Sequence, residues 1–122
     1  MTVSPFDHPL LSALVGDEET AHAFSLEAEI AAMLAFERAL AGAEAETGAI
    51  EPEAAEAIRA GIAAFRPDFA GLKAGVAKDG MAVPEFVRQL RFAVAAEWRE
   101  RLHFGATSQD VIDTALALRL KP

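Results

Sequence analysis

Helix-forming residues dominate this chain, and the residues that interrupt helices are confined to a few places. Ala, Leu and Glu are abundant, whereas Gly and Pro punctuate the sequence at separate positions. Ala, Leu and Glu favour the helix, Gly and Pro end it, and no strand pattern competes. The sequence therefore predicts an all-α fold of about five helices joined by short connections.

The longest predicted helix is Leu26–Thr47. Ser25 can cap its start, because the hydroxyl accepts a free backbone N–H of the first turn, and Gly48 can adopt the left-handed turn that ends it. Two further helices are predicted from Pro52 to Arg66 and from Pro67 to Lys78. Another begins at Pro84 and follows an apolar stripe formed by Val83, Val87, Leu90, Val94 and Trp98. The last predicted helix begins after a cap at Thr107. We expect Trp98 and the phenylalanines to lie in the core.

Two acidic residues, Glu37 and Glu44, fall on the apolar stripe of the longest helix. A buried carboxylate needs a partner, so the first interpretation is a structural pair with an arginine such as Arg88 or Arg91, or exposure where helices diverge. The functional alternative is an acid that lines a cleft.

Length and charge limit the classes of function. The 122 residues, of which 52% are apolar, suffice for one core, so we predict a single helical domain over residues 1–122. The last helix is strongly apolar and lacks an evident cap, which favours the N-terminal part of a longer chain. With 11 Lys and Arg against 19 Asp and Glu, and no basic cluster, we expect no nucleic-acid partner and no membrane partner.

Cysteine and histidine usage argues against several kinds of site. The absence of cysteine excludes disulfides, thiolate metal sites and a cysteine nucleophile. His8, His22 and His103 lack the paired spacing of a zinc-binding helix, so no metal is predicted. The opening residues do not form a secretory signal and no stretch is long enough to span a membrane, so we expect a soluble, cytoplasmic protein.

The segment from His103 to Asp110 combines small and hydrogen-bonding residues before the last helix. Gly105 lets a ligand approach the backbone, Thr107 and Ser108 offer hydroxyl groups, and Gln109 offers an amide. Free N–H groups at the following helix start suit a carboxylate. The segment can therefore bind an anion. On spacing alone, the simpler interpretation is that Thr107 and Asp110 only cap the helix.

This segment, HFGATSQDVIDTALALRL, is similar to the first signature region of the fumarase/aspartase superfamily, most closely to the HxGATSQDxxDT form typical of bacterial 3-carboxy-cis,cis-muconate cycloisomerases. A second stretch, FSLEAEIAAMLAFERALAGAEAETGAIEP, resembles the opening helix of that family. The resemblance covers nearly the whole chain. It implies the N-terminal domain of a helical subunit that forms a homotetramer, with the central bundle and C-terminal domain farther along.

For the site, the resemblance implies that Thr107, Ser108 and Gln109 bind a substrate carboxylate. His103, Gly105 and Asp110 would support them. It implies no catalytic residue in this chain, because the His-bearing segment and the mobile loop with the catalytic serine lie farther along and on other subunits. The implied reaction interconverts a small tricarboxylate and a lactone without a cofactor. The stretch alone is expected to be inactive.

Two alternatives stay open. An adenylosuccinate lyase-like enzyme of the same superfamily would usually have Ser where Gln109 stands, and a His that is absent from KDGMAVPEFVRQL. The sequence also departs from the cycloisomerases at one position, because Gly80 is followed by Met81 where those enzymes usually have Gly-Asn. The other alternative is a non-catalytic helical interaction module, which the apolar face of the last helix would also serve.

Overall fold

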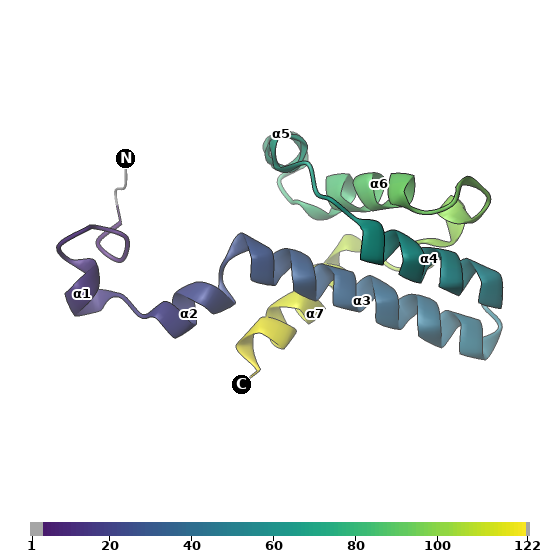
Figure 1. The fold of residues 1–122 in the computed structure, drawn as a ribbon, viewed down its shortest axis with the longest axis horizontal. Coiled ribbons are helices and arrows are strands. Elements are labelled where there is room, and N and C mark those ends of the chain that lie inside the picture. The colour runs from purple at the N-terminus through teal and green to yellow at the C-terminus, as the bar shows by residue number, and fades with distance from the viewer. Residues whose placement is uncertain (1–3, 122) are drawn as a thin grey trace.

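The computed structural model describes residues 4–121, and every regular element within that range is helical (Figure 1). This confirms the predicted all-α fold. In chain order the elements are α1 (Ser12–Val15), α2 (Glu18–Ala23), α3 (Leu26–Thr47), α4 (Pro52–Ala64), α5 (Phe69–Asp79), α6 (Val83–Ala93), the 3-10 helix η1 (Ala96–Arg101) and α7 (Ser108–Leu120). The short helices α1, α2 and η1 add to the five that the sequence predicts.

The long helix α3 packs mainly against α4 and α7, and its bounds are those predicted. The Ser25 hydroxyl accepts the N–H of Ala28 at 3.1 Å, and Gly48 ends the helix with a φ of 79°. Helix α4 returns along α3, and α7 crosses it on another side (Figure 1). Because α3 contacts both, side chains on its inner face meet residues that are far away in sequence.

A single core lies between α3, α4, α6 and α7. Small residues of α4 allow close packing: a Cβ at Gly61 would lie 2.9 Å from Val94 Cγ2. The buried apolar residues are Ile30, Ala32, Met33, Ala41, Ile50, Ala54, Ala55, Ile58, Phe65, Leu72, Val83, Phe86, Val87, Leu90, Val94, Leu102, Val111 and Ala115.

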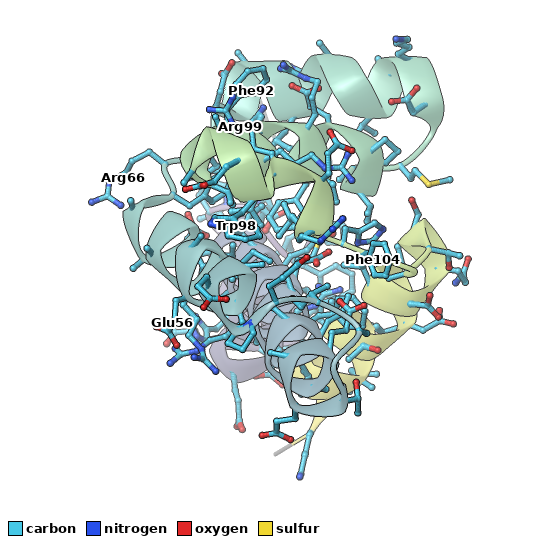
Figure 2. The ribbon with its side chains drawn as sticks, turned by 90° about the vertical axis from the view of Figure 1, so that its right-hand side faces the viewer. Glu56, Arg66, Phe92, Trp98, Arg99 and Phe104 are labelled. Carbon is cyan, nitrogen blue, oxygen red and sulfur yellow. The ribbon has the colours of Figure 1, made fainter. Side chains whose placement is uncertain are left out.

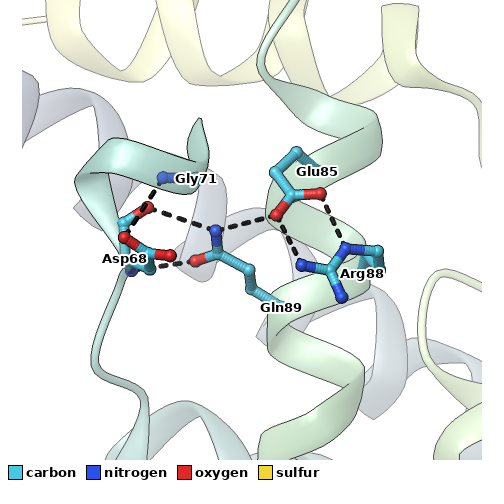
Figure 3. Close-up of polar contacts among 5 residues, drawn as sticks. All are labelled: Asp68, Gly71, Glu85, Arg88 and Gln89. Carbon is cyan, nitrogen blue, oxygen red and sulfur yellow. Dashed lines mark hydrogen bonds and ion pairs between the residues drawn. The ribbon is translucent and has the colours of Figure 1, made fainter. Parts of the chain in front are cut away.

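Helices α5 and α6 are joined by polar contacts that centre on Gln89 (Figure 3). Its amide oxygen accepts the N–H of Asp68 at 2.9 Å, and its amide nitrogen donates to the carbonyl of Asp68 at 3.2 Å. The same nitrogen donates to Glu85 at 3.1 Å, and Arg88 donates to both oxygens of that carboxylate. These bonds, Arg88 first, lower the pKa of Glu85 to about 2. Asp68 in turn caps α5 through the N–H of Gly71.

The apolar stripe predicted to continue to Trp98 breaks at Val94, where the backbone becomes extended. The Arg99 side chain donates to the carbonyl of Val94 at 3.0 Å and to that of Phe92 at 3.4 Å. Carbonyls at the end of α6 thus gain partners without a further helical turn. Figure 2 shows Arg99 beside Phe92, and Trp98 on η1 packs against the core from a different element. The prediction of one continuous helix here was wrong.

The expectation that the phenylalanines lie in the core is only partly right. Phe65 and Phe86 are buried and pack edge to face, with ring centroids 5.7 Å apart. Phe92 and Phe104 are exposed, and each lies under an arginine guanidinium. Phe6, Phe24 and Phe69 are exposed as well.

The first helices extend away from the body as an arm (Figure 1). Asp17 caps α2 by accepting the N–H groups of Glu19 and Thr20. The arm carries several exposed apolar side chains: Phe6, Leu10, Leu11, Leu14 and Val15. Within residues 4–121, no helix combines the length and the apolar character needed to cross a membrane.

Candidate functional site

The segment before α7 forms a tight surface turn. His103 has a φ of 59° and Gly105 a φ of 74°, so two residues occupy the left-handed region. The N–H of Ala106 donates to the carbonyl of His103 at 3.4 Å. Gly105 adopts this conformation freely, whereas a non-glycine residue there costs on the order of 1–3 kcal/mol. The contacts of His103 must therefore compensate for the energetic cost of its left-handed backbone conformation.

The principal contact of His103 is with Glu37. Its Nδ1 lies 2.5 Å from Glu37 Oε1, and the side chains are 12% and 0% exposed. His103 is thus a hydrogen-bonding residue at the base of the loop. The predicted arginine partner of Glu37 was wrong, because this face of α3 packs against α7 and the loop preceding it. Arg88 pairs with Glu85 instead.

Arg91 also holds the base of this loop, although it does not pair with an acid among the described residues. Its Nη2 donates to the carbonyl of Leu102 at 3.3 Å, and Leu102 is fully buried. The Nε atom of Arg91 is buried without a partner among residues 4–121. The start of the loop is therefore held by two contacts: Arg91 binds the carbonyl of Leu102, and Glu37 binds the side chain of His103.

Glu44 lies near this pair on the same helix. Its Oε1 atom is buried and has no hydrogen-bond partner in the described chain. Burial raises the pKa of Glu44, the negative charge of Glu37 raises it further, and His103 acts in the opposite direction. The predicted arginine partner is absent among residues 4–121, and the Glu44 side chain is partly exposed, with one carboxylate oxygen buried.

Thr107 and Asp110 form a complete capping box at the start of α7. The Thr107 N–H and hydroxyl donate to Asp110 Oδ2 at 2.8 and 3.0 Å, and the Asp110 N–H donates to the hydroxyl at 3.4 Å. The bonds from Thr107 lower the pKa of Asp110. The capping interpretation is thus confirmed, and the Thr107 hydroxyl is already engaged.

Ser108 and Gln109 provide the remaining donors. The Gln109 amide donates to Asp113 at 2.6 Å, whereas the half-buried Ser108 hydroxyl has no partner among residues 4–121. The backbone N–H groups of both residues lie in the first turn of α7, where no helical carbonyl can accept them. Together with the positive end of the helix dipole, these groups can receive one carboxylate.

The loop before α7 lies on the surface of the protein. Phe104, Gly105, Thr107 and Gln109 are all exposed. A hollow of about 680 Å³ lies elsewhere, along α3 and α4, and is lined by Arg38, Gly42, Glu46 and Arg59 among others. Within residues 4–121, no three His, Asp or Glu side chains are arranged to hold a metal ion.

Comparisons with known proteins identify this loop-bearing domain. No protein-family model matches the chain. It is 39% identical over 80% of its length to a 3-carboxy-cis,cis-muconate cycloisomerase from Pseudomonas putida, and 33% identical over 99% to an adenylosuccinate lyase from Methanocaldococcus jannaschii. A crystal structure of a fumarate lyase from Mesorhizobium sp. BNC1 matches 85% of it with a TM-score of 0.81 and 34% identity. The chain belongs to the fumarase/aspartase superfamily.

Within this superfamily, the chain resembles the N-terminal part of the subunit. It spans 24% of the P. putida relative, 25% of the M. jannaschii relative and 24% of the fumarate lyase chain. These relatives carry the names of different enzymes, so the superfamily is shown and the individual reaction is not. The comparison supports the resemblance drawn from the HFGATSQDVIDT segment at the level of the superfamily.

Sequence reasoning did not find the Glu37–His103 pair, although both residues were singled out. An acid on an apolar stripe signals a buried partner, and a histidine before a Gly-containing turn signals an anchored loop. These two signals lie 66 positions apart in the chain. Only the packing of α3 against the loop joins them.

Proposed function

We propose that this chain is the N-terminal part of a 3-carboxy-cis,cis-muconate cycloisomerase, which interconverts 3-carboxy-cis,cis-muconate and 4-carboxymuconolactone. The identity to the P. putida cycloisomerase supports this choice, as does the HFGATSQDVIDT segment. In the lactonising direction, a carboxylate oxygen bonds to one carbon of a double bond and a proton adds to the other. No electrons are gained or lost, so the reaction needs no redox cofactor.

In this proposal, the loop before α7 binds one carboxylate of the tricarboxylate substrate. The observation that carries it is the group of free donors at the start of α7: the Ser108 hydroxyl and the backbone N–H groups of Ser108 and Gln109. Thr107 acts mainly through the cap that fixes these donors, and Gly105 leaves room for the ligand. Holding the substrate in one orientation lowers the entropic part of the barrier.

The groups that transfer the proton lie outside this loop in the proposed enzyme. Thr107, Ser108 and Gln109 have no side chain that titrates near neutral pH, and Asp110 is tied into the cap. His103 is held at the base of the loop by its contact with Glu37. The proposed enzyme therefore draws its acid and base from later segments of a longer subunit and from neighbouring subunits of a homotetramer. This chain contributes binding and orientation.

The test is a lactone-formation assay on the protein in its natural length, with Ser108→Ala as the probe. We expect the wild type to form lactone, and Ser108→Ala to raise KM by about tenfold, because one hydrogen bond to a charged ligand is lost. Ser12→Ala on the arm is the matched control and should leave KM unchanged. Absence of lactone formation by the wild type would refute the proposal.

An adenylosuccinate lyase-like activity is the second candidate, since the M. jannaschii relative matches 99% of the chain. Both reactions use substrates with several carboxylates, so the same loop can serve either. Cleavage of adenylosuccinate without lactone formation would favour this candidate. Failure of both assays would favour a non-catalytic helical interaction module.

A further inference from the structure

Glu37 is the only charged or polar residue in the core of the described chain. Transfer of a carboxylate from water into a protein interior is strongly unfavourable unless hydrogen bonds and opposite charge compensate. One oxygen of Glu37 contacts His103, and the other is buried without a partner among residues 4–121. An apolar side chain at this position would avoid the burial cost. The acid therefore serves its contact with His103 rather than the packing of α3.

His103 is also the only described non-glycine residue in the left-handed region. Its carbonyl accepts the N–H of Ala106, so its backbone conformation sets the direction in which the loop leaves Leu102. The side chain is the part of the residue that can hold this conformation in place. Because Nδ1 is directed to Glu37, the ring has a fixed orientation and Nε2 is left for other partners.

The geometry points to Glu37 as a positioning residue, which acts through His103 to fix the Gly105–Gln109 turn before a substrate carboxylate arrives. This inference rests on the proposed function for the identity of the ligand, but not for the mechanical link. Glu37 sits on the most extensively packed helix, and the 2.5 Å contact transmits its fixed position to His103. A preorganised turn binds its ligand more tightly, because less conformational entropy is lost on binding.

The mechanical link is tested by hydrogen exchange in Glu37→Gln and in the matched control Glu46→Gln, which changes an exposed acid on the same helix. We expect exchange at the two hydrogen-bonded N–H groups of the loop, those of Ala106 and Thr107, to rise about tenfold in Glu37→Gln, because a charge-assisted hydrogen bond becomes a weaker neutral one. Exchange in α4 and α6 should stay within about twofold of wild type, and the control should match wild type throughout. Unchanged exchange in the loop, or an equal rise in every helix, would overturn the inference.

The functional consequence is tested by lactone-formation kinetics on the protein in its natural length. Glu37→Gln should raise KM by about tenfold and change kcat less than about threefold, because the turn binds substrate and transfers no proton. His103→Asn keeps a residue that tolerates the left-handed backbone but cannot reproduce the ring contact. If Glu37 acts through His103, the double variant will be no worse in KM than His103→Asn alone.

Additive effects on KM, or a fall in kcat at constant KM, would overturn the role of Glu37. If the wild type forms no lactone, the proposed function fails, and hydrogen exchange still decides whether Glu37 holds the turn. The two failures are therefore distinguishable.

Discussion

The environment of Glu44 disfavours its charged form, because burial and the nearby Glu37 both raise its pKa. It shares a helix face with Glu37, and one of its carboxylate oxygens is buried without a partner in the described chain. The charge of His103 offsets only part of the effect of burial and of Glu37 on the Glu44 carboxyl group. The two acids on this face of α3 thus differ: Glu37 is paired with His103, and Glu44 has no hydrogen-bond partner for Oε1 among residues 4–121.

We expect Glu44→Gln to raise the midpoint of thermal unfolding by a few degrees at neutral pH, because the amide carries no charge to desolvate and does not repel Glu37. The pKa of Glu44 is raised in the folded state above its ordinary value of 4.5. Stability from this site is therefore complete below 4.5 and is lost as the pH rises through the folded pKa. The advantage of the variant should appear over that window and vanish in acid.

Thermal unfolding at acidic and neutral pH checks this, with Glu46→Gln as the exposed control on α3. An equal gain at every pH would show that the benefit does not come from the charge of Glu44.

At the scale of the elements, α4 approaches the end of α6 closely. Gly61 makes this approach possible, because a Cβ there would lie 2.9 Å from Val94 Cγ2 and 3.1 Å from the carbonyl oxygen of Ala93. Gly42 on α3 is different, since a Cβ there would meet only Arg59 Nη2, at 3.6 Å. Two helical glycines thus have opposite roles.

We expect Gly61→Ala to lower the free energy of unfolding by about 1–3 kcal/mol, because α4 and α6 must move apart. Gly42→Ala should raise it by about 0.5–1 kcal/mol, because alanine restricts the unfolded chain without a clash. Denaturant titration of both variants measures these changes. A gain in stability for Gly61→Ala would contradict the close packing seen between these helices.

At the scale of the whole molecule, the body has one core, whereas the arm and the outer face of α7 leave apolar side chains uncovered. Leu14 of α1 is 83% exposed, and Leu118 and Leu120 of α7 are also exposed. Apolar surface that remains in water favours association.

We expect this chain to self-associate reversibly as its concentration rises, through one or both of these apolar surfaces. Sedimentation velocity over a range of concentrations measures the effect, and Leu14→Ser and Leu118→Ser show which surface is responsible. A single monomeric species at the highest concentration, with both variants unchanged, would refute the prediction.

The bounds of α3 and the capping box of α7 could be predicted because each depends on neighbours within a few positions. Ser25 caps the start of α3 with its hydroxyl, and Gly48 ends the helix because its backbone can adopt the left-handed conformation. Thr107 and Asp110 are one turn apart at the start of α7. The sequence by itself therefore determined the helical class, the longest helices and the position of the loop that carries the candidate site.

Only the tertiary structure decided which distant groups meet. Glu37 and His103 are 66 positions apart, and no local rule chooses the histidine over an arginine. Likewise, α6 ends where Arg99 folds back onto the Val94 carbonyl. Five of the phenylalanines stay exposed, because the packing of the helices places them outside the core. Burial and charge pairing depend on how whole helices pack, whereas caps and propensities act within a single turn.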